Sequence, residues 1–162
     1  MFQKFLAAIV AFFVWLFPCL QKTQPLDAKT VANNLIQAIE TEDVELFKKQ
    51  LCRNIKQNVD DLPGKITELF NAIDGDLVDF TWATMGGSFE SDGRGKSTSR
   101  VILNIEFTTT TGSYLLMGGL EYHNTYQPEE MGMRSILLFD DLASTTPIIQ
   151  IRTGNAENGW QD

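Results

Sequence analysis

The sequence predicts a single α+β domain, in which N-terminal helices pack on a curved antiparallel sheet of four to five strands. Apolar residues recur at helical spacing from residue 27 to residue 73, and from residue 77 onward they alternate with polar residues. With 162 residues, 43% of them hydrophobic, the chain can form one hydrophobic core but is short for two domains. We divide it into four parts, namely a signal sequence or anchor at 1–20, a tether at 21–26, the α+β domain at 27–152 and a polar tail at 153–162.

The first 20 residues have the layout of an export signal. Lys4 is followed by an unbroken apolar run from Phe5 to Phe17 and then by the polar tether. A membrane-spanning helix usually needs about 20 apolar residues, so this run is short for a permanent span. We therefore expect an export signal, which stays as an anchor if it is not cleaved, and a domain attached to the outer side of the cytoplasmic membrane.

Cys19 directly follows the apolar run and resembles the acylated cysteine of a bacterial lipoprotein. Leu16 suits the lipobox pattern, whereas Phe17 and Pro18 stand where that pattern has small residues. Two acyl chains would hold the domain firmly on a bilayer, since each buried methylene contributes about 0.8 kcal/mol. The sequence leaves two tethers open, an acylated Cys19 or the uncleaved apolar run.

Three helices are predicted at the start of the domain. Asp27 is a candidate N-cap for the first helix, which extends to about Thr41. Asp43 begins the second helix, and Asp61 caps the third, which ends at Gly75.

Cys52 lies on the apolar side of the second predicted helix. Its only cysteine partner, Cys19, would be acylated, removed or in the membrane, so we expect Cys52 to be a buried free thiol. Two cysteines and a single histidine do not supply the usual all-protein zinc site. We therefore expect no metal and no other cofactor.

Strands are predicted at about 77–84, 99–110, 113–125 and 132–140, with a candidate fifth strand at 146–153. Helices followed by a meander of strands indicate an antiparallel sheet that is covered on one face. Gly118 and Gly119 lie in the middle of a strand and permit a bulge or a bend. We therefore expect the sheet to be curved.

The register of the second and third strands can be tested by how it sorts the residues. A turn centred on Thr111 and Gly112 places Leu103 opposite Leu120 and sorts the residues into two faces. One face is apolar and points inward: Val78, Phe80, Trp82, Val101, Leu103, Ile105, Phe107, Leu116, Gly118, Leu120 and Tyr122. The other face receives Arg100, Glu121 and the single histidine, His123. We expect His123 to be exposed or salt-bridged there.

Five segments in a fixed order carry a family resemblance: "VANNLIQAIETEDVELFKKQLC", "LPGKITELFNAI", "GSFESDGRGK", "TTGSYLLMGGLEY" and "QPEEMGMRSILLFDD". The first resembles the opening helix pair of the nuclear transport factor 2-like superfamily, whose cystatin-like cone packs helices against a curved sheet. The series is similar to a family of uncharacterised exported or lipoprotein-like proteins of Firmicutes within that superfamily. The resemblance covers about residues 30–141. It implies the cone fold, an outside location and a Gram-positive source, and it transfers no activity.

The formal net charge of −8 argues against nucleic acid as a partner, because phosphates would be repelled on average. The segment "GRGKST" at 93–98 ends like a phosphate-binding loop. However, Glu90 stands where such a loop has its first glycine, and a predicted strand follows instead of a helix. We therefore expect a hairpin loop at 93–98 and no nucleic-acid partner.

The inward face of the predicted sheet carries no carboxylate and no histidine. Enzymes of the superfamily tend to carry Asp, His or Tyr inside the cone, where burial changes their proton affinity. The interior is therefore either a filled core or a pocket for an apolar small molecule, in which the Trp82 N–H and the Tyr122 O–H orient the ligand. The residues that would form this pocket are Trp82, Tyr122, Phe80, Leu103 and Leu120.

These observations favour a non-catalytic module with a binding or structural role at the membrane. The alternative is a small enzyme or a carrier that binds an apolar ligand in the cone. Self-association through the outer face of the sheet is a further interpretation, which a strict monomer in sedimentation would exclude. Three apolar residues on that face suggest it: Ile102, Leu115 and Met117.

Overall fold

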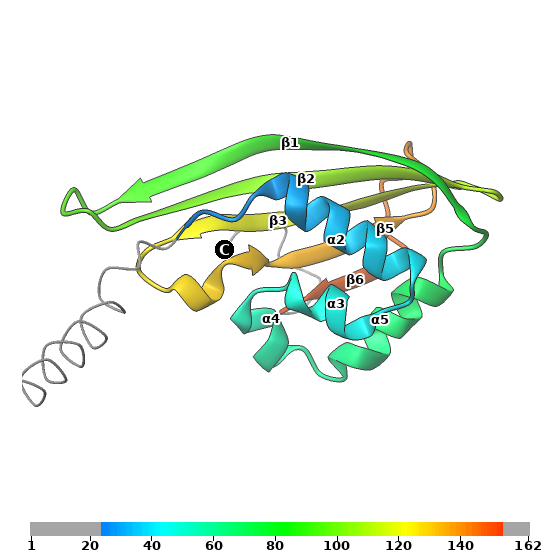
Figure 1. The fold of residues 1–162 in the computed structure, drawn as a ribbon, viewed down its shortest axis with the longest axis horizontal. Helices are drawn as coiled ribbons and strands as arrows, with labels where there is room; N and C mark the ends of the chain where they lie inside the picture. The colour runs from blue at the N-terminus through cyan, green and yellow to red at the C-terminus, as the bar shows by residue number, and fades with distance from the viewer. Residues whose placement is uncertain (1–23, 154–162) are drawn as a thin grey trace, which may run out of the picture.

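A computed structural model describes residues 24–153 of the chain (Figure 1). Within this range it contains four α-helices and a six-stranded antiparallel sheet, which confirms the predicted α+β class. None of the helices in this range is long and apolar enough to span a membrane. The predicted export signal and Cys19 lie outside the described residues, as does nearly all of the polar tail.

The helices are α2 (Ala28–Glu40), α3 (Val44–Lys49), α4 (Arg53–Asn58) and α5 (Leu62–Asn71). All three predicted N-caps are confirmed, because the side chains of Asp27, Asp43 and Asp61 accept hydrogen bonds from backbone N–H groups of α2, α3 and α5. The hydrogen bond that the Thr30 hydroxyl donates to Asp27 lowers the pKa of that carboxyl. The α2 cap therefore stays charged at neutral pH, as suits a helix N-terminus.

The second predicted helix ends with α3, and a separate short helix, α4, follows that the sequence did not predict. Leu51 leaves the helix to form a β-bridge with Met133. The N–H of Met133 donates to Gln50 O at 2.8 Å, and the N–H of Cys52 donates to Met133 O at 3.0 Å. These hydrogen bonds take up backbone groups that a continuous helix would need.

The strands are β1 (Leu77–Ser91), β2 (Ser97–Thr109), β3 (Ser113–Asn124), β4 (Gly132–Met133), β5 (Ser135–Phe139) and β6 (Ile149–Arg152). A 3₁₀ helix, η2 (Pro128–Glu130), connects β3 to β4. The order in the sheet is β1-β2-β3-β5-β6, and β4 also pairs with β3. Figure 1 shows β1 along one edge of the sheet and its hairpin with β2 extending past the end of β3. The sixth strand arises because the strand predicted at 132–140 is interrupted at Arg134.

A single hydrophobic core lies between the helices and one face of the sheet. The helix α2 packs on β1 and β2, whereas α5 packs on β6. The inward residues Leu103, Ile105 and Leu120 are 0% exposed, as the alternation predicts. Phe47 and Leu35 fill the same core from the helices.

The register predicted for the β2–β3 hairpin is wrong by two residues. Leu103 pairs with Gly118 and not with Leu120. The turn lies earlier than predicted because the N–H of Thr109 donates to Gly112 O at 2.8 Å, while the Thr109 hydroxyl accepts from the N–H of Gly112 at 3.1 Å. A shift of two residues keeps side chains on their own face, so the predicted inward residues of β2 and β3 still face the core, where Val101 and Tyr122 are half-buried.

Val78 was expected to face the core, and this expectation is wrong. Its side chain is 64% exposed. A β-bulge between Leu77 and Asp79 moves the alternation by one residue, so Leu77 packs against the core in its place.

Gly118 and Gly119, where a bulge or a bend was expected, pair with β2 without a bulge and lie where β3 changes its partner from β5 to β4. The N–H of Arg134 donates to Gly119 O at 2.7 Å, and the N–H of Gly119 donates to Ser135 Oγ at 3.1 Å. The carbonyl oxygen of Ser135 approaches Gly118 so closely that a Cβ atom there would overlap it. The absence of a side chain at Gly118 therefore allows the backbone of β5 to approach β3 closely at this point.

Candidate functional site

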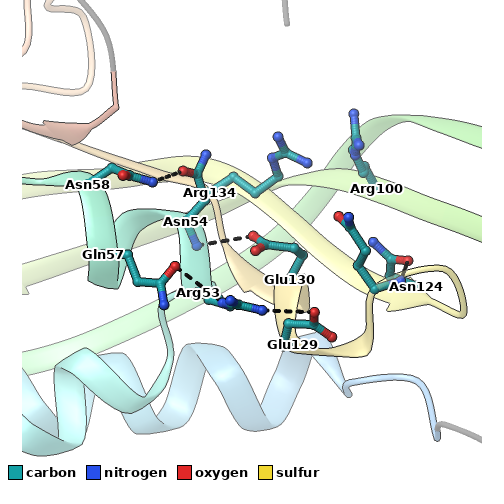
Figure 2. A pocket seen from close by; sticks show the side chains of 10 residues that line it. Arg53, Asn54, Gln57, Asn58, Arg100, Asn124, Glu129, Glu130 and Arg134 are labelled. Atoms are coloured by element: carbon teal, nitrogen blue, oxygen red, sulfur yellow. Dashed lines mark hydrogen bonds and ion pairs between the residues drawn. The ribbon is translucent and has the colours of Figure 1, made fainter.

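A polar cleft with a volume of about 390 Å³ lies at the end of the sheet where β2 begins and β3 ends. Figure 2 shows side chains of α4 entering it from one side and those of Arg100 and Asn124 from the other. We call it the arginine cleft. It is lined by Arg53, Asn54, Gln57, Asn58, Arg100, Asn124, Gln127, Glu129, Glu130 and Arg134.

Glu121 holds two arginines of the cleft together. Its side chain is 0% exposed, and its Oε2 accepts from Arg100 Nε at 3.1 Å and from Arg134 Nη1 at 2.6 Å. Its Oε1 accepts from Asn124 Nδ2. A buried carboxylate is costly unless it is paired and hydrogen-bonded, and both oxygens here have charged or amide donors. The Glu121 cluster therefore fixes β2, β3 and the β4–β5 connection relative to one another.

The chain between β3 and η2 is fixed by the same cluster. The Oδ1 atom of Asn124 accepts from the N–H of Tyr126 at 2.9 Å and from the N–H of Gln127 at 2.7 Å. The Asn124 amide nitrogen donates to Glu121, so both ends of this amide are held by hydrogen bonds. The turn that leads into η2 is thus positioned by the buried carboxylate.

Two guanidinium groups share one carboxylate, which leaves one positive charge in excess within the Arg100–Glu121–Arg134 cluster. Arg53 pairs with Glu129, and the carboxylate of Glu130 balances the excess, so the charged side chains at the cleft sum to zero. The Arg100 and Arg134 side chains are each 31% exposed. A guanidinium has five N–H donors. Within residues 24–153, the side chain of Arg100 donates only through Nε and that of Arg134 only through Nη1. The remaining donors are available for charge-assisted, bidentate hydrogen bonds to a carboxylate or phosphate.

The opposite wall of the cleft is built by α4 and η2. The carboxylate of Glu130 accepts from the N–H of Asn54 at 3.1 Å and so caps α4, whose own N-cap residue makes no side-chain cap. Arg53 Nη1 donates to Glu129 Oε1 at 3.0 Å, and Arg53 Nε donates to Gln57 Oε1 at 3.2 Å. These contacts hold the first turn of α4 against η2.

The chemistry of this lining suits binding of an anion through hydrogen bonds. The side chains are all charged or amides, and none of them is a histidine, cysteine or hydroxyl nucleophile. Among the described residues, no group of three His, Cys, Asp or Glu side chains could hold a metal ion.

The residues predicted to line an apolar pocket lie elsewhere. Leu103 and Leu120 are 0% exposed in the core, Phe80 and Tyr122 pack against the core, and Trp82 is 38% exposed. None of the five lines the arginine cleft. Phe80 borders a cleft of about 130 Å³ on β1 and β2 without the other four. Binding of an apolar ligand by these residues stays a prediction.

A second cleft, of about 330 Å³, lies at the other end of β2. Apolar side chains of both layers border it, including Ile39 and Phe70 from the helices and Phe107 from the sheet. Glu40, Glu42 and Asp76 also line this second cleft. No basic side chain lines it, in contrast to the arginine cleft.

His123 differs from expectation, because it is neither exposed nor salt-bridged. Its ring is half-buried, and its Nε2 lies 3.0 Å from Ser97 Oγ. Glu121, the carboxylate named on the same predicted face, pairs instead with Arg100 and Arg134. His123 Nδ1 is buried without a hydrogen-bond partner in the described part of the chain. The ring does not line the arginine cleft.

Cys52 is buried, as predicted, with 1% of its surface exposed. It forms no disulfide within the described residues. Burial raises the pKa of the Cys52 thiol, so the thiol is protonated and unreactive at neutral pH. Its role is packing between α4 and the sheet.

Sequence reasoning missed the arginine cleft although it placed Arg100 and Glu121 on one face of the sheet. The predicted register put Arg100 opposite His123, whereas the observed register puts it opposite Glu121. A cross-strand pair of opposite charges would have been the signal for the correct register. The third member, Arg134, lies beyond η2 and is brought in by pairing that no local pattern indicates.

None of the curated proteins matches the chain in sequence. A family model described as a domain of unknown function, DUF5104, matches residues 34–141. This range contains the whole arginine cleft and the strands from β1 to β5. Because the match covers more than half of the chain, the chain belongs to the DUF5104 family.

Proposed function

We propose that this chain is an exported, membrane-tethered module with the cone fold of the nuclear transport factor 2-like superfamily, and that it binds an anionic ligand in the arginine cleft. The role of the module is to bind this ligand without catalysis, and its N-terminal segment keeps the domain at the outer side of the cytoplasmic membrane. Helices packed on one face of a curved sheet support the cone. The apolar run and Cys19 support the tether.

One observation carries the anionic ligand: two guanidinium groups meet on one oxygen of the fully buried Glu121 and keep further N–H donors at the cleft. Such donors are held in place by the carboxylate, so they lose little conformational freedom when an anion binds. The net charge of −8 opposes a single anion only weakly, because charges more than about 8 Å away are largely screened at physiological salt.

Replacement of Arg134 by glutamine tests the proposal. Arg134→Gln removes one guanidinium and leaves Glu121 paired with Arg100, so the fold should persist while an anion loses its bidentate partner. Hydrogen bonds to charged groups contribute about 1.5–3 kcal/mol, so the affinity for inorganic phosphate should fall about tenfold or more. Calorimetric titration with phosphate measures this.

Arg94→Gln is the matched control, because Arg94 is an exposed arginine in the β1–β2 turn, outside the cleft. It should leave phosphate binding unchanged. Equal affinities of the wild type and Arg134→Gln would overturn the anion site.

The tether has its own test, which is the mass of the mature N-terminus in a membrane fraction. We expect either a mass that fits an acylated Cys19 or one that retains residues 1–18. A chain released into the medium with an unmodified, shortened N-terminus would contradict tethering.

A further inference from the structure

We propose that the ligand of the arginine cleft is an acidic sugar, a polyhydroxylated molecule that carries a carboxylate or phosphate group. This inference rests on the proposed function, because it takes Arg100 and Arg134 as the subsite for the acidic group. It adds a second subsite, formed by amide side chains, for the hydroxyl groups.

Amides make up half of the lining of the cleft: Asn54, Gln57, Asn58, Asn124 and Gln127. Asn54, Gln57 and Asn58 follow a spacing of three and four residues, which puts them on one side of α4. Figure 2 shows them on the wall that faces Arg100 and Asn124. An amide presents both a donor and an acceptor, as a sugar hydroxyl does, so the two groups are complementary.

Three of these amides keep unused hydrogen-bonding capacity. Gln57 accepts from Arg53 through Oε1, which leaves its NH₂ group, and Asn58 donates to Asn54 Oδ1 at 2.5 Å, which leaves its oxygen. The Gln127 side chain makes no hydrogen bond with the described residues, so it offers both. The cleft therefore has donors and acceptors in excess of what an anion alone would use.

Other ligand classes fit the lining less well. No apolar side chain lines the cleft, so an apolar molecule would strip water from charged and amide groups without replacing it. A bare inorganic anion would use the two guanidinium groups and leave the amides to water. The carboxylates of Glu129 and Glu130 would repel a ligand with several phosphates more strongly than one with a single acidic group. The carboxylate of Glu129 can also accept hydrogen bonds from the hydroxyl groups of a sugar. The volume lies within the range of about 300–1,000 Å³ that small-molecule sites occupy.

The experiment compares three probes on the full chain, kept in a detergent without sugar headgroups. The probes are glucuronate, glucose and acetate. Glucuronate carries both the hydroxyl groups and a carboxylate, glucose carries only the hydroxyl groups, and acetate carries only the carboxylate. Glucuronate should bind about tenfold more tightly than either glucose or acetate. The affinities of glucose 6-phosphate and inorganic phosphate are compared in the same way. This second comparison shows whether the cleft prefers a phosphorylated sugar to a uronate.

Variants separate the two subsites. Arg134→Gln should weaken glucuronate and acetate alike, whereas Gln57→Ala should weaken glucuronate about fivefold and leave acetate unchanged. Asn58→Ala is a second variant with the same expectation. Asn33→Ala, an exposed amide on α2, is the control and should change nothing.

The results distinguish this inference from the proposed function. If acetate and phosphate bind in an Arg134-dependent way but the hydroxyls of glucuronate or glucose 6-phosphate add no affinity, the acidic sugar is overturned and the anion site stands. If none of the probes binds, both fall.

Discussion

Gly118→Ala is expected to lower the free energy of unfolding by about 3 kcal/mol, a large part of the stability of a small domain. A Cβ atom at this position would overlap the carbonyl oxygen of Ser135 and lie 2.9 Å from its carbonyl carbon. Both are backbone atoms of β5, which is held between β3 and β6 and cannot withdraw. Urea unfolding followed by tryptophan fluorescence measures the effect.

Gly119→Ala is the matched control one residue along the same strand. Its Cβ would meet only Ser135 Oγ at 3.8 Å, an ordinary van der Waals distance. Its free energy of unfolding should stay within about 0.5 kcal/mol of the wild type. Similar losses in the two variants would show that Ser135 of β5 does not approach Gly118 as closely as described.

Glu121→Gln should lower the free energy of unfolding by about 3 kcal/mol. Removing one partner of a buried ion pair leaves the other charges uncompensated. Here Arg100 and Arg134 would repel each other across a neutral amide, and if its oxygen accepts from the two arginines, its NH₂ group faces the Asn124 amide donor without an acceptor. Urea unfolding at neutral pH measures the difference.

Glu106→Gln serves as the control for Glu121→Gln. Glu106 is an exposed glutamate on the neighbouring strand β2 and makes no ion pair with the described residues. Its replacement should change stability by less than about 0.5 kcal/mol. A Glu121→Gln protein as stable as this control would mean that the buried cluster does not hold the cleft together.

Local features of the fold could be predicted because they depend on neighbouring residues. The aspartate caps of α2, α3 and α5 use side chains within the same turn as the N–H groups they accept from. The alternation in β2 and β3 identified the buried face even with the wrong partners, since a shift of two residues preserves the faces.

Features set by distant contacts could not be predicted in this way. The break between α3 and α4 depends on Met133, far along the chain from Leu51. The bulge that exposes Val78 is a backbone irregularity that the order of apolar and polar residues in β1 does not indicate.

The arginine cleft shows the same limit for the candidate site. Its charged centre combines Arg100, Glu121 and Arg134, and only the first two lie in strands that are joined by a predictable hairpin. The segment from Asn124 to Arg134 supplies two of the three side chains that donate to Glu121, and its path follows from the tertiary structure. A carboxylate expected on the outer face is therefore the most deeply buried charge of the cleft.

The most direct test of the anion site is nuclear magnetic resonance of the arginine Nε–H groups during titration with inorganic phosphate. We predict saturable shifts of the Arg100 and Arg134 signals at the same phosphate concentration, while the signal of Arg94 stays in place. Signals of Arg100 and Arg134 that do not move, or that move only as much as that of Arg94, would contradict an anion site between α4 and the sheet.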